Sequence, residues 1–171
     1  MMSKLVLTVI AEDRVGIVEE LSRLVREAQG NWLDANLARL AGKFAGIIEI
    51  ELPASNSGAL QASLGSLGNM QVFCHAGSSQ LNHNGPLLNL RVTGNDRPGI
   101  VSDITHVLRR VGANIRKLAS RCDSAPNWGS PLFVLELEVE LAPAMTPAEL
   151  VALLEAVADD LMVDELTPNS A

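Results

Sequence analysis

The sequence predicts an α+β fold made of two tandem copies of one β-α-β-β-α-β unit. The stretch AEDRVGIV at residues 11–18 returns as GNDRPGIV at residues 94–101, 83 positions later. The similarity continues on both sides of this motif, over the flanking strand and helix patterns. Both copies then run through a polar stretch into a clear strand, a second helix and a last strand. A repeat of this length is typical of a duplicated supersecondary unit.

Each copy opens on a strand. Apolar Leu88, Leu90 and Val92 alternate with polar residues, which is the pattern of a strand with one buried face. Residues 4–10 form the equivalent strand and are more apolar throughout. A strand fits this N-terminal run better than a signal peptide does, because no small-residue cleavage site follows it.

A helix follows each strand, because apolar residues recur at the spacing of one helical face. Gly30 and Gly112 stand where these helices are expected to stop, and second strands begin at about Asn31 and Asn114. The apolar positions are Ile17, Val18, Leu21, Leu24, Val25 and Ala28 in the first copy and Ile100, Val101, Ile104, Val107, Leu108 and Val111 in the second.

The third strand has the clearest pattern of all. Leu135, Leu137, Val139 and Leu141 point inward and the glutamates between them point outward, where we expect Arg91 of the neighbouring strand to pair with one of them. The first copy repeats this pattern with inward Ile48, Ile50 and Leu52.

The second helix of the C-terminal copy has a capping box, with Thr146 as N-cap, Pro147 in the first helical position and Glu149 two residues later. Its counterpart, SGALQASLGSLG, holds more glycine, so we expect a shorter and less stable helix there. Final strands are expected at residues 70–76 and about 161–167.

This element order predicts a ferredoxin-like layout, in which a four-stranded antiparallel sheet carries both helices on one face. We expect a first domain at residues 1–77, a polar, glycine-rich linker at 78–86 and a second domain at 87–171. The second strand of each sheet is an edge with unpaired backbone groups, so two units can join their edges, either within one chain or between chains. A homodimer is expected.

Composition and charge exclude several classes of protein. Hydrophobic residues make up 47% of the chain, but no run approaches the length of a membrane span. The net charge is −7, and the segment from Cys122 onward contains no Lys or Arg. Direct nucleic-acid binding is therefore not expected, and the basic residues Arg109, Arg110, Arg116, Lys117 and Arg121 fit a helix end and a solvated strand better than a phosphate-binding patch.

No catalytic or metal-binding pattern is present in the sequence. There is no Ser-His-Asp arrangement, no G-x-x-x-x-G-K loop and no histidine at metal-ligand spacing from another ligand, so we expect neither an enzyme nor a cofactor. Cys74 and Cys122 form no C-x-x-C pair and are interpreted as buried thiols of a cytoplasmic protein.

The repeated motif lies where a strand ends and a helix begins, and it allows two interpretations. The free N–H groups of the helix start attract a carboxylate, while Asp96 offers an acceptor for an ammonium group, so the loop suits a zwitterionic amino acid. Glycine would let such a ligand approach, and Pro98 would fix φ in the first helical turn. Alternatively, the aspartate only caps the helix and the glycine only permits close helix–strand packing.

A unit of this order with DRPGIV in its first loop and GANI some fifteen residues later resembles an ACT domain. ACT domains are small regulatory modules that usually bind amino acids where two domains meet. The second copy matches at Asp96, Arg97, Pro98, Gly99, Ile100, Val101, Gly112, Asn114 and Ile115. The first copy matches at Asp13, Arg14, Gly16, Ile17, Val18 and Asn31 and departs at Val15 and Trp32.

The resemblance implies where a ligand binds. The implied residues are Asp96, Arg97, Pro98, Gly99, Ile100 and Asn114 in the second copy and Asp13, Arg14, Val15, Gly16, Ile17 and Asn31 in the first. Because the first copy lacks the proline, we expect the loop at Asp96 to be the tighter site if only one of them binds tightly.

Two ACT units in tandem resemble the group of glycine cleavage system transcriptional repressors. That resemblance implies a regulator that senses glycine or a similar amino acid and acts on a DNA-binding transcriptional regulator as its protein partner. The alternative is a detached amino-acid-binding regulatory subunit of a metabolic enzyme. The sequence decides neither the ligand nor the partner.

Overall fold

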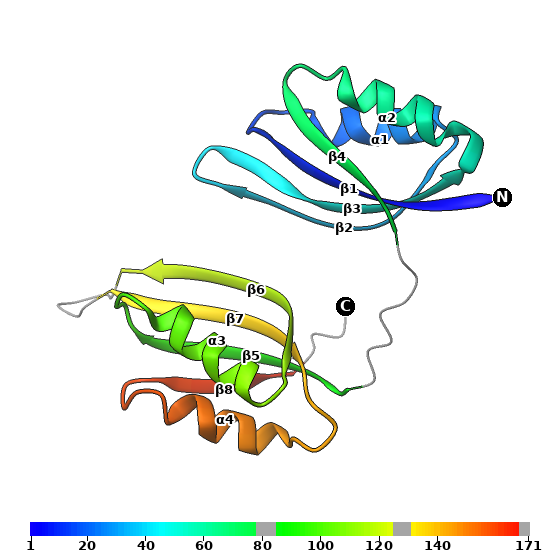
Figure 1. Cartoon of the computed structure of the whole chain (residues 1–171). Coiled ribbons are helices and arrows are strands. Elements are labelled where there is room, and N and C mark those ends of the chain that lie inside the picture. Colours follow the sequence, from blue (N-terminus) through cyan, green and yellow to red (C-terminus); the bar gives the residue numbers. More distant parts are fainter. Residues whose placement is uncertain (78–84, 125–130, 168–171) are drawn as a thin grey trace. The chain divides into compact units, whose positions relative to one another are not determined.

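The computed structural model divides the chain into two units, Met1–Leu81 and Asn82–Ala171. It describes residues 1–77, 85–124 and 131–167. Both units follow the order β-α-β-β-α-β, as Figure 1 shows, so the predicted tandem fold is confirmed. Most of the predicted linker 78–86 lies outside the described residues, and the domain boundaries on either side of it stay predictions.

Unit 1 has a four-stranded antiparallel sheet in the order β2-β3-β1-β4. Both of its longer helices cover one face of this sheet (Figure 1). Its elements are β1 (Met2–Glu12), α1 (Ile17–Glu27), β2 (Asn31–Leu40), β3 (Lys43–Pro53), the 3-10 helix η1 (Ala54–Asn56), α2 (Ser57–Gly65) and β4 (Met70–Ala76).

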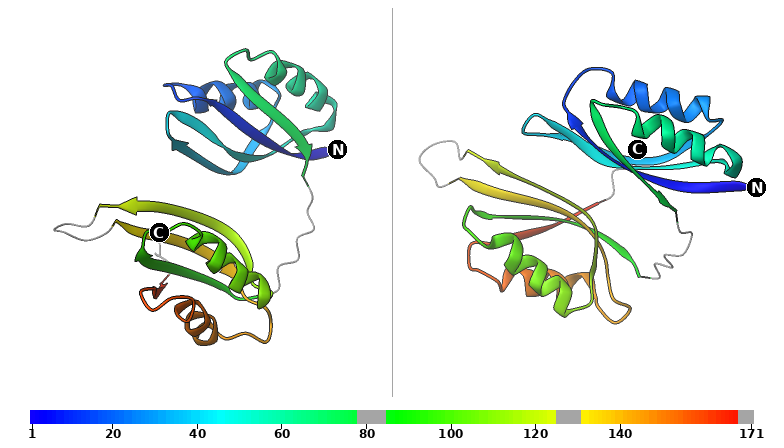
Figure 2. Two further views of the ribbon diagram at one scale, coloured as in Figure 1. Left: turned by 60° about the vertical axis from the view of Figure 1, so that its left-hand side comes forward. Right: turned by 45° about the horizontal axis from the view of Figure 1, so that its top comes forward.

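Unit 2 repeats this topology in the order β6-β7-β5-β8. The two views of Figure 2 show its helices, again, on one face of the sheet. Its elements are β5 (Leu87–Asn95), α3 (Ile100–Arg110), β6 (Asn114–Asp123), β7 (Leu132–Glu140), α4 (Pro147–Glu155) and β8 (Met162–Leu166).

Each unit has its own core between the helices and the sheet. In unit 1, Leu7 of β1, Leu21 of α1 and Ile48 of β3 are completely buried. In unit 2, Leu90 and Ile104 are completely buried at equivalent positions. Burying one such side chain contributes about 2 kcal/mol, so these stripes hold the first helix of each unit on its sheet.

The first helices end differently in the two units. Gly112 has φ +70°, the left-handed conformation that commonly follows a helix. In unit 1 the left-handed residue is Gln29, with φ +57°, and Gly30 follows it. A Cβ on Gly30 would lie 3.0 Å from the Val25 carbonyl oxygen, so this glycine permits a close approach and does not supply the left-handed turn.

The second helices are equally long, so the prediction of a shorter helix in unit 1 is wrong: α2 and α4 each have nine residues. The capping box of α4 is confirmed, since the Glu149 N–H donates to Thr146 Oγ1 and Glu149 accepts from the Thr146 N–H. The hydrogen bonds that the Thr146 N–H and the Thr146 hydroxyl donate to the Glu149 carboxylate lower its pKa. By contrast, α2 has no side-chain cap.

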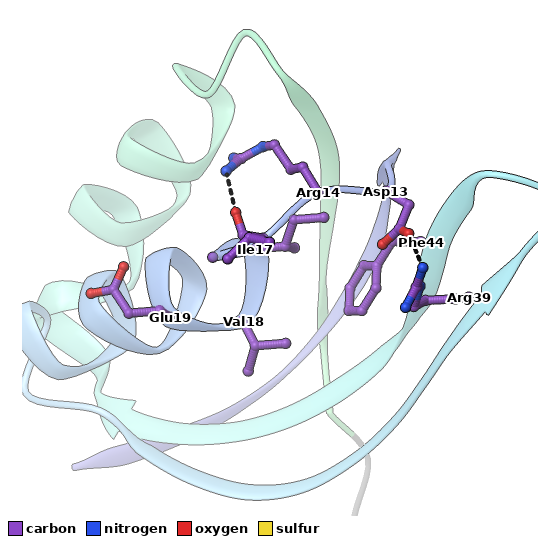
Figure 3. Close-up of a pocket in the computed structure, with 9 residues that line it drawn as sticks. Asp13, Arg14, Ile17, Val18, Glu19, Arg39 and Phe44 are labelled. Carbon is purple, nitrogen blue, oxygen red and sulfur yellow. Dashed lines mark hydrogen bonds and ion pairs between the residues drawn. The ribbon is translucent and has the colours of Figure 1, made fainter.

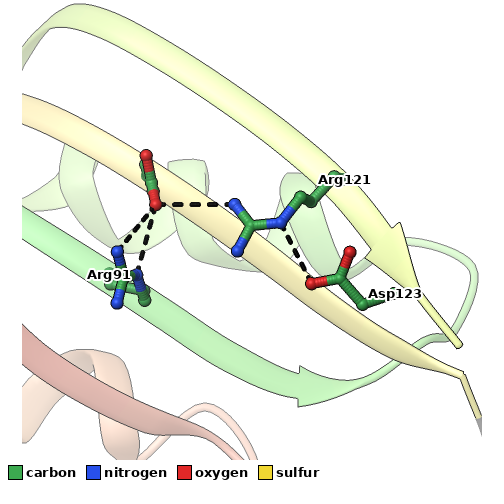
Figure 4. Close-up of polar contacts among 4 residues, drawn as sticks. Arg91, Arg121 and Asp123 are labelled. Carbon is green, nitrogen blue, oxygen red and sulfur yellow. Dashed lines mark hydrogen bonds and ion pairs between the residues drawn. The ribbon is translucent and has the colours of Figure 1, made fainter. Parts of the chain in front are cut away.

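The helix-free faces of the two sheets differ in chemistry. In unit 1, Thr8 pairs in register with Ile47 and Phe73, and Ile10, Ile47 and Phe73 are 43%, 50% and 55% exposed. In unit 2 the same face is charged, and Arg91 binds Glu136 at 3.0 Å, as predicted (Figure 4).

A network extends from the Arg91–Glu136 pair. Arg121 lies 3.5 Å from Glu136 and 3.0 Å from Asp123 (Figure 4). The hydrogen bond from Arg91, followed by the one from Arg121, lowers the pKa of Glu136. Arg116 lies 3.8 Å from Glu138, and Arg109 and Arg110 occupy the last turn of α3. The basic residues therefore sit beside carboxylates or at a helix end and do not form one cationic patch.

Candidate functional site

The repeated motif forms the same β-turn in both units. Gly16 (φ 92°, ψ 1°) and Gly99 (φ 87°, ψ −5°) have the values of the third residue of a type II turn. In unit 2 the turn is closed by the Ile100 N–H, which donates to the Arg97 carbonyl at 3.5 Å. A Cβ on either glycine would meet nothing within 4 Å. The positive φ therefore requires glycine, and the alternative of close helix–strand packing is wrong.

This turn also overturns the capping interpretation of the aspartates. The N-caps of α1 and α3 are Gly16 and Gly99, and neither helix has a side-chain cap. Asp13 and Asp96 lie three residues earlier, too far from the helix start to cap it. Pro98 lies in the second turn position, not in the first helical turn, and there its fixed φ suits a type II turn.

The arginine of each motif is turned toward the helix. Arg97 Nη1 lies 2.8 Å from Asp103 Oδ2, and Arg14 forms the equivalent ion pair with Glu20. Arg14 also donates to the Val15 carbonyl at 3.4 Å. Both arginines therefore fasten the turn to the first helical turn.

In unit 1 the loop borders an open hollow of about 620 Å³, which we call the Asp13 hollow. Asp13, Arg39 and Phe44 lie on one side of it, with Val18 and Glu19 of α1 on the other (Figure 3). Residues 13–17, the first-copy loop residues for which the resemblance implies ligand binding, all line this hollow. Its lining is Asp13, Arg14, Val15, Gly16, Ile17, Val18, Glu19, Arg39 and Phe44.

Backbone donors open into the same region. The first helical hydrogen bond of α1 runs from the Glu20 N–H to the Gly16 carbonyl at 2.9 Å. The N–H groups before Glu20 have no partner within the helix and carry the positive end of its dipole. A carboxylate in the Asp13 hollow would be stabilised by them.

Sequence reasoning missed Arg39, which reaches the loop from β2. Its Nη2 lies 2.7 Å from Asp13 Oδ2, and the Asp13 N–H donates to the Gly42 carbonyl at 2.9 Å. Arg39 pairs in register with the buried Phe44 of β3, which places both side chains on the helix-covered side of the sheet.

In unit 2, Cys122 occupies the position of Arg39, opposite Phe133. This cysteine is exposed, so its interpretation as a buried thiol is wrong; Cys74 is half-buried. Partial desolvation, then the charge of Asp96 and a hydrogen bond to it, raises the pKa of the Cys122 thiol. Within the described residues, Asp96 forms no ion pair. The offset of 83 aligns Arg39 with Cys122 and could have revealed this difference.

The two predicted asparagines do not join the loops within their own units. Asn31 pairs with Glu51 near the end of β3, whereas Glu12, just before Asp13, pairs with Lys43 at its start. Eight residues of strand separate these positions, or roughly 26 Å. Asn114 lies at the corresponding far end of unit 2, opposite Glu140. Each unit therefore presents the loop and the asparagine as separate features.

Fold and loop together define a class of protein, the small βαββαβ modules with a glycine-containing turn before the first helix. Comparison with known families gives the particular one. Models described as ACT domain match residues 3–73 and residues 89–149. The chain belongs to the ACT domain family, whose members are regulatory domains that bind small amino acids.

Solved structures share this tandem fold over their whole length. An unknown protein from Galdieria sulphuraria is 28% identical, with a TM-score of 0.81 over 98% of this chain and 100% of that one. A protein provisionally assigned as a glycine cleavage system transcriptional repressor is 18% identical, with a TM-score of 0.71 over 98% of this chain and 99% of that one. No curated protein sequence matches this chain.

Two searches of the described residues found no further site. Across 1–77, 85–124 and 131–167, no group of three or more His, Cys, Asp or Glu side chains is placed to hold a metal ion. In the same part of the chain, no helix is both long enough and apolar enough to cross a membrane.

Proposed function

We propose that this chain is a non-enzymatic regulator that binds a small, glycine-like amino acid and modulates transcription through a protein partner in the cytoplasm. The observation that carries the proposal is the Asp13 hollow, where an aspartate and a helix start border one space. An aspartate is complementary to an α-ammonium group, and free helical N–H groups are complementary to an α-carboxylate.

The transcriptional part is supported by the resemblance to glycine cleavage system transcriptional repressors and by the tandem fold shared with the protein provisionally assigned to that role. A DNA-binding transcriptional regulator is the proposed partner. The net charge of −7 supports action on a protein and not on nucleic acid directly.

The proposed ligand-binding residues are those of the two loops, together with Asn31 and Asn114. An asparagine far from the loop of its own unit can complete a site only if another unit brings its loop close. A homodimer through the edge strands β2 and β6 is the proposed arrangement, since each edge strand has only one neighbour in its sheet.

Calorimetric titration with glycine, serine and alanine tests the ligand. We expect binding to the wild-type chain and at least tenfold weaker binding after Asp13→Ala or Asp96→Ala at whichever loop is occupied, since a charged hydrogen bond is lost. Absence of binding by every amino acid in the panel contradicts the sensor role.

Affinity purification from the native cytoplasm tests the partner. A DNA-binding regulator that copurifies in stoichiometric amount supports the transcriptional role. Copurification with a biosynthetic enzyme would instead support the alternative, a detached regulatory subunit.

A further inference from the structure

We propose that Arg39 makes the Asp13 hollow the α-amino-acid site of this chain and that the loop of unit 2 lacks the guanidinium that completes the carboxylate-binding part of such a site. This inference rests on the proposed amino-acid binding and reverses the sequence-based expectation that the loop at Asp96 is the tighter site.

The charges around the Asp13 hollow balance. Its lining contains two acidic side chains, Asp13 and Glu19, and two basic ones, Arg14 and Arg39. Arg14 has an equivalent in Arg97 of unit 2, so Arg39 is the guanidinium that distinguishes this hollow. A neutral but polar lining favours a zwitterion, which has both charges and no net charge, over a simple anion or cation.

Both partners of the Asp13–Arg39 pair have hydrogen-bonding groups that the pair does not use. Arg39 is 76% exposed and directs Nη2 to Asp13 Oδ2, which leaves most of its five N–H donors available. Asp13 Oδ1 accepts no hydrogen bond from the described residues. An amino-acid head group can therefore lie against the pair with its carboxylate on Arg39 and the α1 N–H groups and its ammonium on Oδ1.

The pair is also weak enough to share. Because Arg39 is largely exposed, the ion pair contributes little to the stability of the fold, and a ligand that redirects Arg39 gives up little. The planar guanidinium matches a carboxylate in a two-point geometry that a lysine would not provide. Phe44, beneath the pair, supplies an apolar floor for the ligand's carbon atoms.

Unit 2 retains the aspartate and the helix start of this arrangement but has no counterpart of Arg39. Cys122 replaces Arg39, and Ser102 follows the turn where unit 1 has Glu19. A cysteine side chain has no positive charge in either protonation state, so Cys122 does not attract a carboxylate as Arg39 does. Asp96 alone can bind an ammonium group, as can any exposed carboxylate.

The experiment exchanges the two residues. Arg39→Cys gives unit 1 the residue of unit 2, Cys122→Arg does the reverse, and Arg39→Gln removes the charge without adding a thiol. Arg26→Cys, on the exposed side of α1, is the matched control. All three positions are exposed, and thermal unfolding verifies that each of the four variants is folded.

The probes are glycine, serine and alanine, and then, for the best binder, its N-acetyl and amide forms, each of which lacks one charge. We expect one site per wild-type chain and about ten- to hundredfold weaker binding for Arg39→Cys, Arg39→Gln and both blocked forms. Arg26→Cys should bind as wild type, and Cys122→Arg should raise the stoichiometry from one site to two.

The inference is overturned if Arg39→Gln and Arg39→Cys bind like wild type, or if Asp96→Ala abolishes binding while Asp13→Ala does not. Those results would leave amino-acid binding intact. Failure of the wild-type chain to bind any of the three amino acids overturns both this inference and the proposed function.

Discussion

The two loops have the same backbone and different chemistry. Both have a type II turn with glycine at positive φ and an arginine bound to the following helix. They differ at the strand residue opposite the buried phenylalanine, which is Arg39 in unit 1 and Cys122 in unit 2. The repeated motif therefore specifies a shape, and we propose that a residue from another strand decides what that shape can bind.

The loops are also held in place differently. In unit 2, Asp160 Oδ2 accepts a hydrogen bond at 2.8 Å from the Asn95 N–H, one residue before Asp96. In unit 1, the ion pairs of Asp13 with Arg39 and of Arg14 with Glu20 hold the loop. Both loops also have an arginine bound to the following helix and a backbone hydrogen bond from the aspartate N–H, so the loops differ in the Asp13–Arg39 ion pair and in the Asn95–Asp160 hydrogen bond.

The largest expected effect concerns β3, where Gly46 lies opposite Leu37 and unit 2 has Leu135 at the equivalent place. A Cβ on Gly46 would lie 2.0 Å from the Asn36 carbonyl oxygen, so Gly46→Ala should force β2 away and lower the free energy of unfolding by about 3 kcal/mol. Urea denaturation followed by Trp32 fluorescence measures it. Gly58→Ala, where a Cβ meets nothing within 4 Å, is the control; equal stability of the two variants would show that β2 is not tightly held.

The next effect tests whether the turns are equivalent. Gly16→Ala and Gly99→Ala should each cost about 1–2 kcal/mol, because both residues have positive φ and neither Cβ meets a neighbour. Native-state amide hydrogen exchange at the buried helix residues Leu21 and Ile104 reports on unit 1 and on unit 2 separately. A cost in one unit alone would mean that the two turns differ despite their shared dihedral angles.

A smaller change in stability is expected when Val15 and Pro98 are exchanged between the two turns. Val15 is 99% exposed in the turn position that proline occupies in unit 2. Val15→Pro should stabilise unit 1 by about 0.4–1 kcal/mol by restricting the unfolded chain, and Pro98→Val should destabilise unit 2 by a similar amount. Thermal unfolding measures both changes. Loss of stability in Val15→Pro would place the φ of Val15 away from the value that proline requires.

The smallest effect is a difference in acid sensitivity. Hydrogen bonds lower the pKa of three carboxyl groups of unit 2: Glu136 through Arg91, Glu149 through Thr146, and Asp160 through the Asn95 N–H. A lowered pKa in the folded state stabilises the fold above the unfolded value, near pH 4, and that contribution is lost as the pH falls further. The urea midpoint of the wild-type chain, followed by circular dichroism, should therefore fall between pH 7 and pH 3. The midpoint of the Asp160→Asn variant should fall less steeply over the same range. Identical pH dependence of the two chains would remove Asp160 from this explanation.

Local patterns predicted the fold and could not predict the site completely. The structure confirms the alternation of Leu88, Leu90 and Val92 and the capping box at Thr146. Both patterns could be predicted because they depend on residues close together in the sequence. Arg39 reaches Asp13 only because β2 folds back beside β3, a contact that no short window contains. For the same reason, no short window shows that Asn31, which follows the end of α1, lies at the opposite end of the sheet from the loop.

The contrast between the helix-free faces has a consequence for handling the protein in concentrated salt. Dissolved ions screen exposed pairs such as Arg121–Asp123, while sulfate strengthens the tendency of apolar surface to leave water. Salting-out should therefore favour contacts through the exposed apolar side chains of the two faces, which are Ile10, Ile47 and Phe73 in unit 1 and Met162 in unit 2. Concentrated salt would therefore weaken the ion pairs on the surface of this protein and strengthen the association of its exposed apolar side chains.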